Sequence, residues 1–352
     1  MLFVNCTICL CTATTLDVGS GQTYSTDGID DYIEINNAIS AAKSGDIVYL
    51  HSGTYSVSKP INILNKNDIT FKGDGSKNTV ITASSYDAFL GSNYGDDTRS
   101  LIQLKNVSDV TMSGFTLKGI LPQREPEDQS ENGILVDHSS GLKFQDIYFT
   151  QLSNDGIRAY GDKSKIKNTF VSDCTFNSTD HDCIGLWDVQ NWQIYHCSMN
   201  VNSNSGISLR NSNDVEVNNN IFYSYPENYG NGGIELNENV SNIKIHHNVF
   251  QDMVCSRYTG KGIYEDEDGA TGSIIVNNNV FYNCPGGKIV TKNLEVKESN
   301  NIYATQVFDW TSQGYGYDPQ TISAPSETNN WLLNILIELE KFIKRVSSFN
   351  GS

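Results

Sequence analysis

Short apolar stretches return at a nearly constant interval through the middle of the chain. Each has a small residue, then isoleucine, and usually a second apolar residue two places later. The six stretches are "NGILVD" from Asn132, "DGIRAY" from Asp155, "DCIGLW" from Asp182, "SGISLR" from Ser205, "GGIELN" from Gly232 and "KGIYED" from Lys261. Their starts lie 23, 27, 23, 27 and 29 residues apart. The alternation of period two within each stretch predicts a short strand.

A second series of strand patterns follows within the same repeats. Its members are "FVSDCTF" from Phe170, "VEVNNNIF" from Val215, "IKIHHNVF" from Ile243 and "IIVNNNVF" from Ile274, separated by the turn formers Asn, Ser, Asp and Gly. A coil of this length cannot bury its apolar side chains alone, so coils must stack. The prediction is an all-β right-handed parallel β-helix, since the alternative, a leucine-rich solenoid, requires an L-x-x-L-x-L framework that the chain lacks.

Two stretches outside the repeats have helical spacing. Apolar residues at Ile35, Ala38, Ile39 and Ala42 precede Gly45, which predicts a capping helix over the first coil. Residues 331–346 form a second amphipathic pattern, which we interpret as a cap or packing arm rather than a membrane or partner-binding helix. The expected organisation is a leader remnant at 1–15, a β-helix domain at 16–325 and a C-terminal helix at 326–352.

Composition and charge exclude several classes of partner. The 352 residues are 38% hydrophobic, which is enough for a sizeable core, and carry a formal net charge of −17. Such a negative chain is not expected to bind nucleic acid, because phosphate recognition needs a basic surface. No segment has the length of a membrane span, and the apolar start of the chain indicates a secreted or cell-surface protein. The sequence does not fix the oligomeric state.

Strand alternation predicts which side chains leave the core. If the repeated isoleucines point inward, the residues two places before them and one and three places after them point to solvent. These three columns are Asn132, Asp155, Asp182, Ser205, Gly232 and Lys261; Leu135, Arg158, Gly185, Ser208, Glu235 and Tyr264; and Asp137, Tyr160, Trp187, Arg210, Asn237 and Asp266. Neighbouring rungs of a sheet lie about 4.8 Å apart, so acids, arginines and aromatic rings gather on one face.

This face has the chemistry of a site for an acidic polysaccharide. Tyr160 and Trp187 are predicted to stack on sugar rings, and Arg158 and Arg210 to bind a uronate carboxylate. Long insertions ahead of the strands that start at Asn132, Gly232 and Lys261, with none comparable ahead of Asp155 and Ser205, would form the walls of a groove. The plainer alternative is that outward charges on a sheet simply face water and pair with one another.

The N-terminal region carries a family resemblance. The segment "GSGQTYSTDGIDDYIEINNAISAAKSGDIVYLHSGTY" resembles the opening of pectin-lyase-like β-helix proteins, and the similarity of pattern covers roughly residues 17–305. That group includes polygalacturonases, polysaccharide lyases, mannuronan epimerases, phage tailspikes and the disaggregatases of methane-producing archaea. The resemblance implies a carbohydrate ligand without selecting a reaction.

Paired carboxylates make hydrolysis the first expectation. "NDGI" and "HDCI" resemble the N-T-D and D-D-C motifs of polygalacturonases, which places Asp155, His181 and Asp182 in a reaction centre, with Asp180 and Glu235 as further acids. Ser205 stands where the G-H-G histidine of those enzymes would fall, and no R-I-K follows. A disaggregatase-like hydrolase of another uronate-containing glycan is therefore the prediction.

Two alternatives remain open at this point. In a lyase or epimerase, Arg158 or Arg210 would neutralise the uronate, and Tyr160 or His181 would transfer the proton. In a glycan-binding surface-layer or adhesin module, the same residues would bind without chemistry. No cofactor is required by the hydrolase prediction and no metal is assigned to its site, but "EDEDG" at Glu265 resembles part of an acidic calcium loop.

Overall fold

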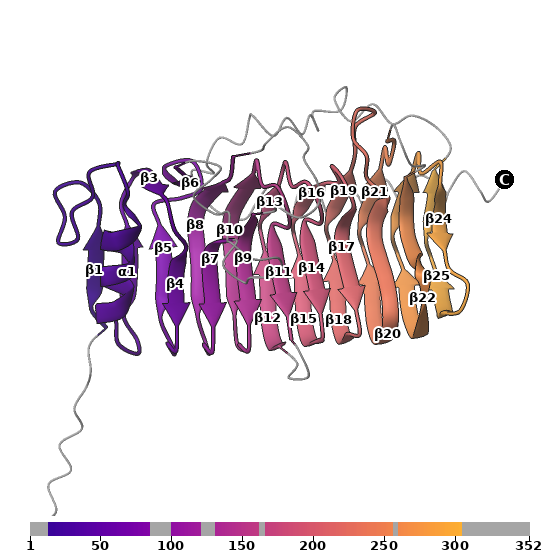
Figure 1. The fold of residues 1–352 in the computed structure, drawn as a ribbon. Coiled ribbons are helices and arrows are strands. Elements are labelled where there is room, and N and C mark those ends of the chain that lie inside the picture. The colour runs from indigo at the N-terminus through magenta and orange to yellow at the C-terminus, as the bar shows by residue number, and fades with distance from the viewer. Residues whose placement is uncertain (1–12, 85–99, 121–130, 162–165, 256–259, 305–352) are drawn as a thin grey trace, which may run out of the picture. The chain divides into compact units, whose positions relative to one another are not determined.

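In a computed structural model, the chain is described at residues 13–84, 100–120, 131–161, 166–255 and 260–304. The chain divides into two compact units, Met1–Phe308 and Asp309–Ser352, and every described residue belongs to the first. This unit is a stack of parallel strands with one helix in the described part (Figure 1). None of the helices in the described ranges is long and apolar enough to cross a membrane.

The first ladder of strands is the one that the repeated isoleucines predict. It runs through β4 (Ile61–Leu64), β7 (Ser100–Lys105), β9 (Asn132–Asp137), β11 (Ile157–Tyr160), β14 (Ile184–Trp187), β17 (Ser205–Arg210), the starts of β20 (Gly232–His246) and β22 (Lys261–Asn277), and β24 (Gly287–Val290). The isoleucines at 134, 157, 184, 207, 234 and 263 pair in register and are fully buried. The predicted register is therefore confirmed.

Two further ladders complete each coil. The second ladder joins β1 (Thr15–Val18), β2 (Ile47–Leu50), β5 (Thr70–Gly73), the start of β8 (Thr111–Lys118), the start of β10 (Lys143–Thr150), β12 (Ile166–Ser172), β15 (Val189–Tyr195), β18 (Asn213–Asn218), the ends of β20 and β22, and β25 (Glu295–Ser299). The third ladder joins β3 (Gly53–Val57), β6 (Thr79–Ala83), the ends of β8 and β10, β13 (Thr175–Phe176), β16 (Ser198–Asn200), β19 (Ile221–Tyr223), β21 (Val249–Gln251), β23 (Val280–Tyr282) and β26 (Ile302–Ala304). Apolar side chains from all three ladders fill the interior.

Identical side chains stack in the turn between the second and third ladders. Asn220, Asn248 and Asn279 are buried, and each backbone N–H donates to the side-chain oxygen of the asparagine one coil later, at 2.9–3.0 Å. The cysteines Cys174 and Cys197 fill the same position in earlier coils as buried free thiols. The ladder satisfies backbone groups that the turn would otherwise leave unpaired.

Replacing Asn248 by alanine is expected to lower the free energy of unfolding by about 2 to 3 kcal/mol, because Asn220 loses the acceptor of its buried N–H. The same substitution at exposed Asn37 in the helix should be neutral or slightly stabilising, since alanine is the better helix former. Chemical denaturation of both variants measures the difference. Equal stability of the two variants would show that the asparagine ladder does not contribute to the free energy of unfolding.

The helix predicted near the N-terminus is present as α1 (Tyr32–Ala41), and its buried face is formed by Ile35, Ala38 and Ile39. It packs against β1, β3 and β4. Its role as a cap stays a prediction. Residues 1–12 of the expected leader and the expected helix at 331–346 lie outside the described residues.

Candidate active site

Asp155 and Asp182 lie where the chain turns into the first ladder, Glu235 lies within β20, and the burial of all three differs from the prediction. Asp155 and Asp182 were expected to face solvent, but both are fully buried, and Glu235 is only 6% exposed. Two facts account for this error. Asp155 and Asp182 precede the first residues of β11 and β14, so strand alternation does not govern them. The residue just before each rung also reaches back over the preceding rung, as His181 does over Asp155.

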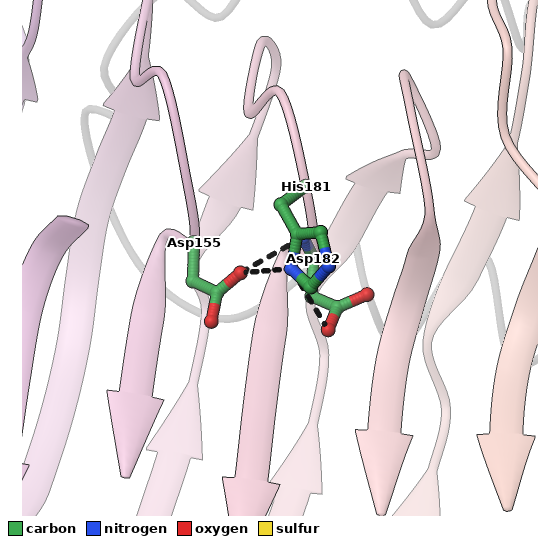
Figure 2. Close-up of side chains that lie close together, drawn as sticks. All are labelled: Asp155, His181 and Asp182. Carbon is green, nitrogen blue, oxygen red and sulfur yellow. Dashed lines mark hydrogen bonds and ion pairs between the residues drawn. The ribbon is translucent and has the colours of Figure 1, made fainter. Parts of the chain in front are cut away.

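Asp155, His181 and Asp182 form one cluster drawn from two adjacent coils (Figure 2). The imidazole Nδ1 of His181 lies 2.7 Å from Asp155 Oδ1 and 3.3 Å from Asp182 Oδ2. The backbone N–H of Asp182 also donates to Asp155 Oδ1, at 3.0 Å. The His181 side chain is 42% exposed, against 0% and 1% for the two carboxylates. The imidazole is therefore the part of the cluster that meets solvent.

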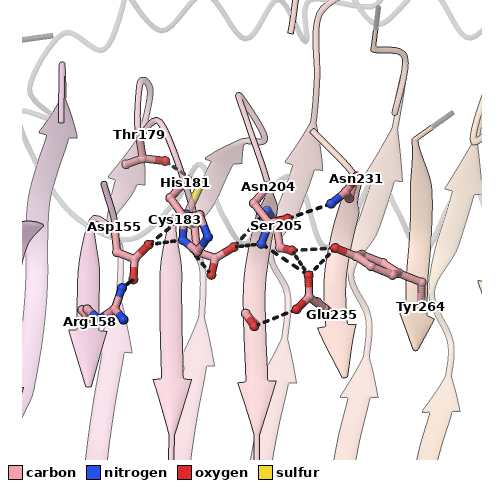
Figure 3. Close-up of polar contacts among 12 residues, drawn as sticks. Asp155, Arg158, Thr179, His181, Cys183, Asn204, Ser205, Asn231, Glu235 and Tyr264 are labelled. Atoms are coloured by element: carbon pink, nitrogen blue, oxygen red, sulfur yellow. Dashed lines mark hydrogen bonds and ion pairs between the residues drawn. The ribbon is translucent and has the colours of Figure 1, made fainter. Parts of the chain in front are cut away.

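The outer oxygens of the two carboxylates are held by neighbouring groups (Figure 3). Arg158 Nη1 donates to Asp155 Oδ2 at 3.4 Å. Asn204 Nδ2 and the Ser205 backbone N–H donate to Asp182 Oδ1 at 2.9 and 3.0 Å. Asp182 Oδ2 is buried and accepts no hydrogen bond, so its interaction is the ionic one with His181.

The surroundings shift the three pKa values in different directions. Burial raises the pKa of Asp182 to about 7, and the charges of Asp155 and Glu235 add to this effect against that of His181. Burial also raises the pKa of Asp155, but His181 and Arg158 outweigh it and hold that pKa below its usual value. For His181, burial lowers the pKa, yet the two carboxylates raise it to about 10. At neutral pH the imidazole is thus a cation that forms an ion pair with ionised Asp155.

These shifts predict a pH dependence of stability. A folded-state pKa raised above the unfolded value gives stability that is complete below the unfolded pKa and is lost as pH rises through the folded pKa. The contribution of Asp182 should therefore fall between pH 4 and 7, and that of His181 between about 6.5 and 10. Chemical denaturation across this range should show a shallower decline from pH 4 to 7 in Asp182→Asn than in the unmodified chain. Identical slopes would contradict the shift.

Glu235 belongs to an adjoining network rather than to the cluster. Its oxygens accept hydrogen bonds from Tyr264 OH at 2.6 Å, Ser205 Oγ at 3.0 Å, and Asn204 Nδ2 and Ser208 Oγ at 3.3 Å each. Asn204 joins the two parts because it donates to both Asp182 and Glu235. These contacts satisfy Glu235 within the protein, which favours a positioning role over contact with substrate.

The predicted binding residues do share one face. Tyr160, Trp187 and Arg210 stand in register on β11, β14 and β17. The Arg158 guanidinium lies 4.5 Å from the centre of the Trp187 ring, and Tyr160 is 49% exposed. Arg210 Nε lies 3.9 Å from Glu238 Oε1. Geometry thus brings the four residues together, while their role in binding stays a prediction.

The remaining predicted acids lie at other places. Asp180 is half-buried in the turn before His181, where its backbone N–H donates to the Leu152 carbonyl at 2.9 Å. Glu265 is 6% exposed. Burial raises its pKa, but N–H donors of Asn293, Lys292 and Ala270 lower it to about 2. Its carboxylate is thus engaged by donors, and calcium binding there stays a prediction.

Asn204, Ser205 and Tyr264 support the site but were not predicted to do so. The sequence could have indicated Asn204, because a polar residue precedes the first-ladder strand in successive coils. These residues are Glu131, Asn154, His181, Asn204 and Asn231. A polar column at this place supplies side chains that reach back to the preceding rung, as Asn231 does to Asn204 at 2.7 Å.

The groove predicted from long loops falls partly on residues 121–130 and 256–259, which lie outside the described ranges. A cavity of about 420 Å³ lies instead on the second ladder, where Tyr49, Lys72, Asp74 and Gln145 help to line it. It shares no residue with the cluster.

The cluster is also the place in the described ranges where three potential metal ligands meet, with one atom each of Asp155, His181 and Asp182 within 4.8 Å of one another. The 2.7 Å contact between His181 Nδ1 and Asp155 has the length of a charged hydrogen bond. This length favours a proton, rather than a metal ion, between the two atoms.

Comparisons with known proteins agree with the architecture. The family model described as "right handed beta helix region" matches residues 100–252 and 132–305, which together exceed half of the chain, and a second model, "rhamnogalacturonase A/epimerase, pectate lyase-like", matches residues 23–107. The chain therefore belongs to the right-handed β-helix family, within which it resembles pectate-lyase-like proteins. No curated protein sequence matches it.

Solved structures show the same fold at low identity. The surface adhesin PfbA of Streptococcus pneumoniae is 15% identical with a TM-score of 0.55, over 83% of this chain and 93% of that one. An alginate lyase from Paenibacillus sp. str. FPU-7 is 13% identical with a TM-score of 0.50, over 80% and 99%. At these identities the likeness concerns the fold alone.

Proposed function

We propose that the chain is a polysaccharide depolymerase that hydrolyses an acidic glycan at the Asp155–His181–Asp182 cluster. One observation carries the proposal, namely a half-exposed imidazole held by two buried carboxylates from adjacent coils. Nδ1 of His181 interacts with both carboxylates, and Nε2 makes no hydrogen bond with any described residue. Nε2 is therefore the ring nitrogen that can form a hydrogen bond with a substrate.

Proton donation is the role that this arrangement favours. The two buried carboxyl groups keep the imidazole protonated at neutral pH, so it acts as an acid and not as a base. In hydrolysis, His181 Nε2 would protonate the oxygen between two sugars as that bond breaks, water would supply the hydroxyl group to the other side, and the remaining proton of that water would return to Nε2. Asp155 and Asp182 would hold the proton on Nδ1 and leave Nε2 as the donor, and the negative charge of Asp155 would stabilise the positive charge that develops on the sugar.

A uronate-containing glycan suits the surface around the cluster. Arg158, His181 and Arg210 bring positive charge to one face of a chain with a net charge of −17, and Tyr160 and Trp187 lie beside them. An anionic polymer would be attracted to this face and repelled elsewhere. The substrate class matches that of disaggregatase-like enzymes, and such a substrate implies a secreted or cell-surface location. The proposed reaction requires no cofactor.

Elimination is a second candidate because Arg158 lies close enough to the cluster to neutralise a uronate carboxylate. A lyase or epimerase must remove the proton next to that carboxylate, which requires an unprotonated base. The raised pKa of His181 opposes this role at neutral pH, and so hydrolysis remains the first candidate.

Sizing and spectroscopy of the products test the proposal. The chain should shorten members of a panel of acidic polysaccharides and release reducing ends without ultraviolet absorption. An absorbing unsaturated uronate would establish a lyase, and a change of sugar configuration without shortening would establish an epimerase. Binding without any product would establish an adhesin and refute the enzymatic proposal.

A further inference from the structure

Two histidines meet at the turn between the second and third ladders, far along the chain from the cluster. His246 ends β20, and His247 follows with φ 55°, at the left-handed position that Asn219 and Asn278 hold in the adjacent coils. The two Nδ1 atoms lie 2.9 Å apart, and the ring planes are inclined by 86°. Both residues are partly exposed.

This separation matches one edge of a metal coordination shell. A divalent metal about 2.0 to 2.1 Å from each nitrogen would have an N–metal–N angle of about 90° when the nitrogens are 2.9 Å apart. Such an angle suits octahedral or tetragonal ions, whereas a tetrahedral ion would need the nitrogens about 3.3 Å apart.

The far ring nitrogen of His246 contacts a carboxylate, as the far nitrogen of metal-bound histidines often does. His246 Nε2 lies 2.8 Å from Glu216 Oε1 on β18. A carboxylate on the far ring nitrogen fixes the ring and makes the other nitrogen a better ligand. Partial exposure leaves room for water to complete the coordination.

We propose that Nδ1 of His246 and Nδ1 of His247 chelate one Ni²⁺ or Cu²⁺ ion, with Glu216 holding the His246 ring. Two imidazoles favour these ions over Ca²⁺ and Mg²⁺, which prefer oxygen ligands, and the 90° angle disfavours Zn²⁺. The alternative is a plain N–H···N hydrogen bond between the rings. The inference does not depend on the proposed reaction.

Isothermal titration of the untagged chain with NiCl₂, CuCl₂ and ZnCl₂ tests the site. We expect saturable binding of Ni²⁺ or Cu²⁺ that weakens at least tenfold in His246→Ala and His247→Ala, with Zn²⁺ binding more weakly than either. Glu216→Gln should weaken binding about tenfold. Electron paramagnetic resonance of the Cu²⁺ form should show two nitrogen ligands, which His247→Ala reduces to one.

Two controls separate this site from the other histidines. His196 occupies the same turn position two coils earlier, beside Asp173 and without an adjacent histidine, so His196→Ala should bind the metal as the unmodified chain does. His181→Ala should also bind the metal as the unmodified chain does, which would exclude metal binding at the Asp155–His181–Asp182 cluster. The proposal is overturned by lack of Ni²⁺ and Cu²⁺ binding, by binding that survives in His247→Ala, or by equal losses in His196→Ala or His181→Ala. Circular dichroism of each variant confirms that the fold is intact.

Discussion

Asp182→Asn is expected to reduce the rate of glycan cleavage by about 10²- to 10⁴-fold while the fold is retained. The asparagine oxygen can still accept from Asn204 and from the Ser205 backbone, so the rung keeps its hydrogen bonds. The amide that replaces Oδ2, however, lacks the negative charge through which Asp182 raises the pKa of the imidazole. The measurement is kcat on a substrate from the polysaccharide panel, with thermal unfolding as the check on the fold.

Asp188→Asn is the matched control, because Asp188 directly follows β14 and accepts a hydrogen bond from Asn211 on the neighbouring coil. It should keep most of the activity. Equal activity in Asp182→Asn and Asp188→Asn would remove Asp182 from the mechanism, and equal inactivity would point to a structural effect shared by the turns.

His181→Gln is expected to cause a loss of similar size, about 10²- to 10⁴-fold in kcat. Glutamine can donate a hydrogen bond to Asp155, which keeps the buried carboxylate paired, but it cannot donate a proton to a leaving oxygen. Binding of the glycan should change far less than turnover, because Arg158, Trp187 and Tyr160 remain in place.

The control for this substitution is His196→Gln on the second-ladder turn, which should leave kcat unchanged. A His181→Gln enzyme with full turnover would show that the imidazole is not the proton donor. If binding of the glycan were lost together with turnover, His181 would be a binding residue instead.

The repeat pattern was sufficient to predict the register of the first ladder. Isoleucines at a near-constant interval can be buried together only if coils stack in phase, so Tyr160, Trp187 and Arg210 had to align. The meeting of Asp155 with His181 and Asp182 followed from the same register.

The burial of the acids could not be predicted from alternation. Asp155 and Asp182 precede their strands, and the exposure of each depends on which side chain the next coil lays over it. The same limit applies to Glu235, whose outward position on β20 is covered by Tyr264 from β22 and by Ser205 from β17. Contacts across coils of unequal length depend on loop geometry that no local pattern encodes.

Nitrogen chemical shifts of the His181 imidazole, followed by nuclear magnetic resonance from pH 5 to 11, test the central claim without a known substrate. The claim is that adjacent coils clamp this imidazole between two buried carboxylates. The ring should stay protonated through pH 8 and titrate near pH 10, and Asp155→Asn should lower the midpoint. Titration near the ordinary histidine value of about 6.5, unchanged in Asp155→Asn, would contradict the account.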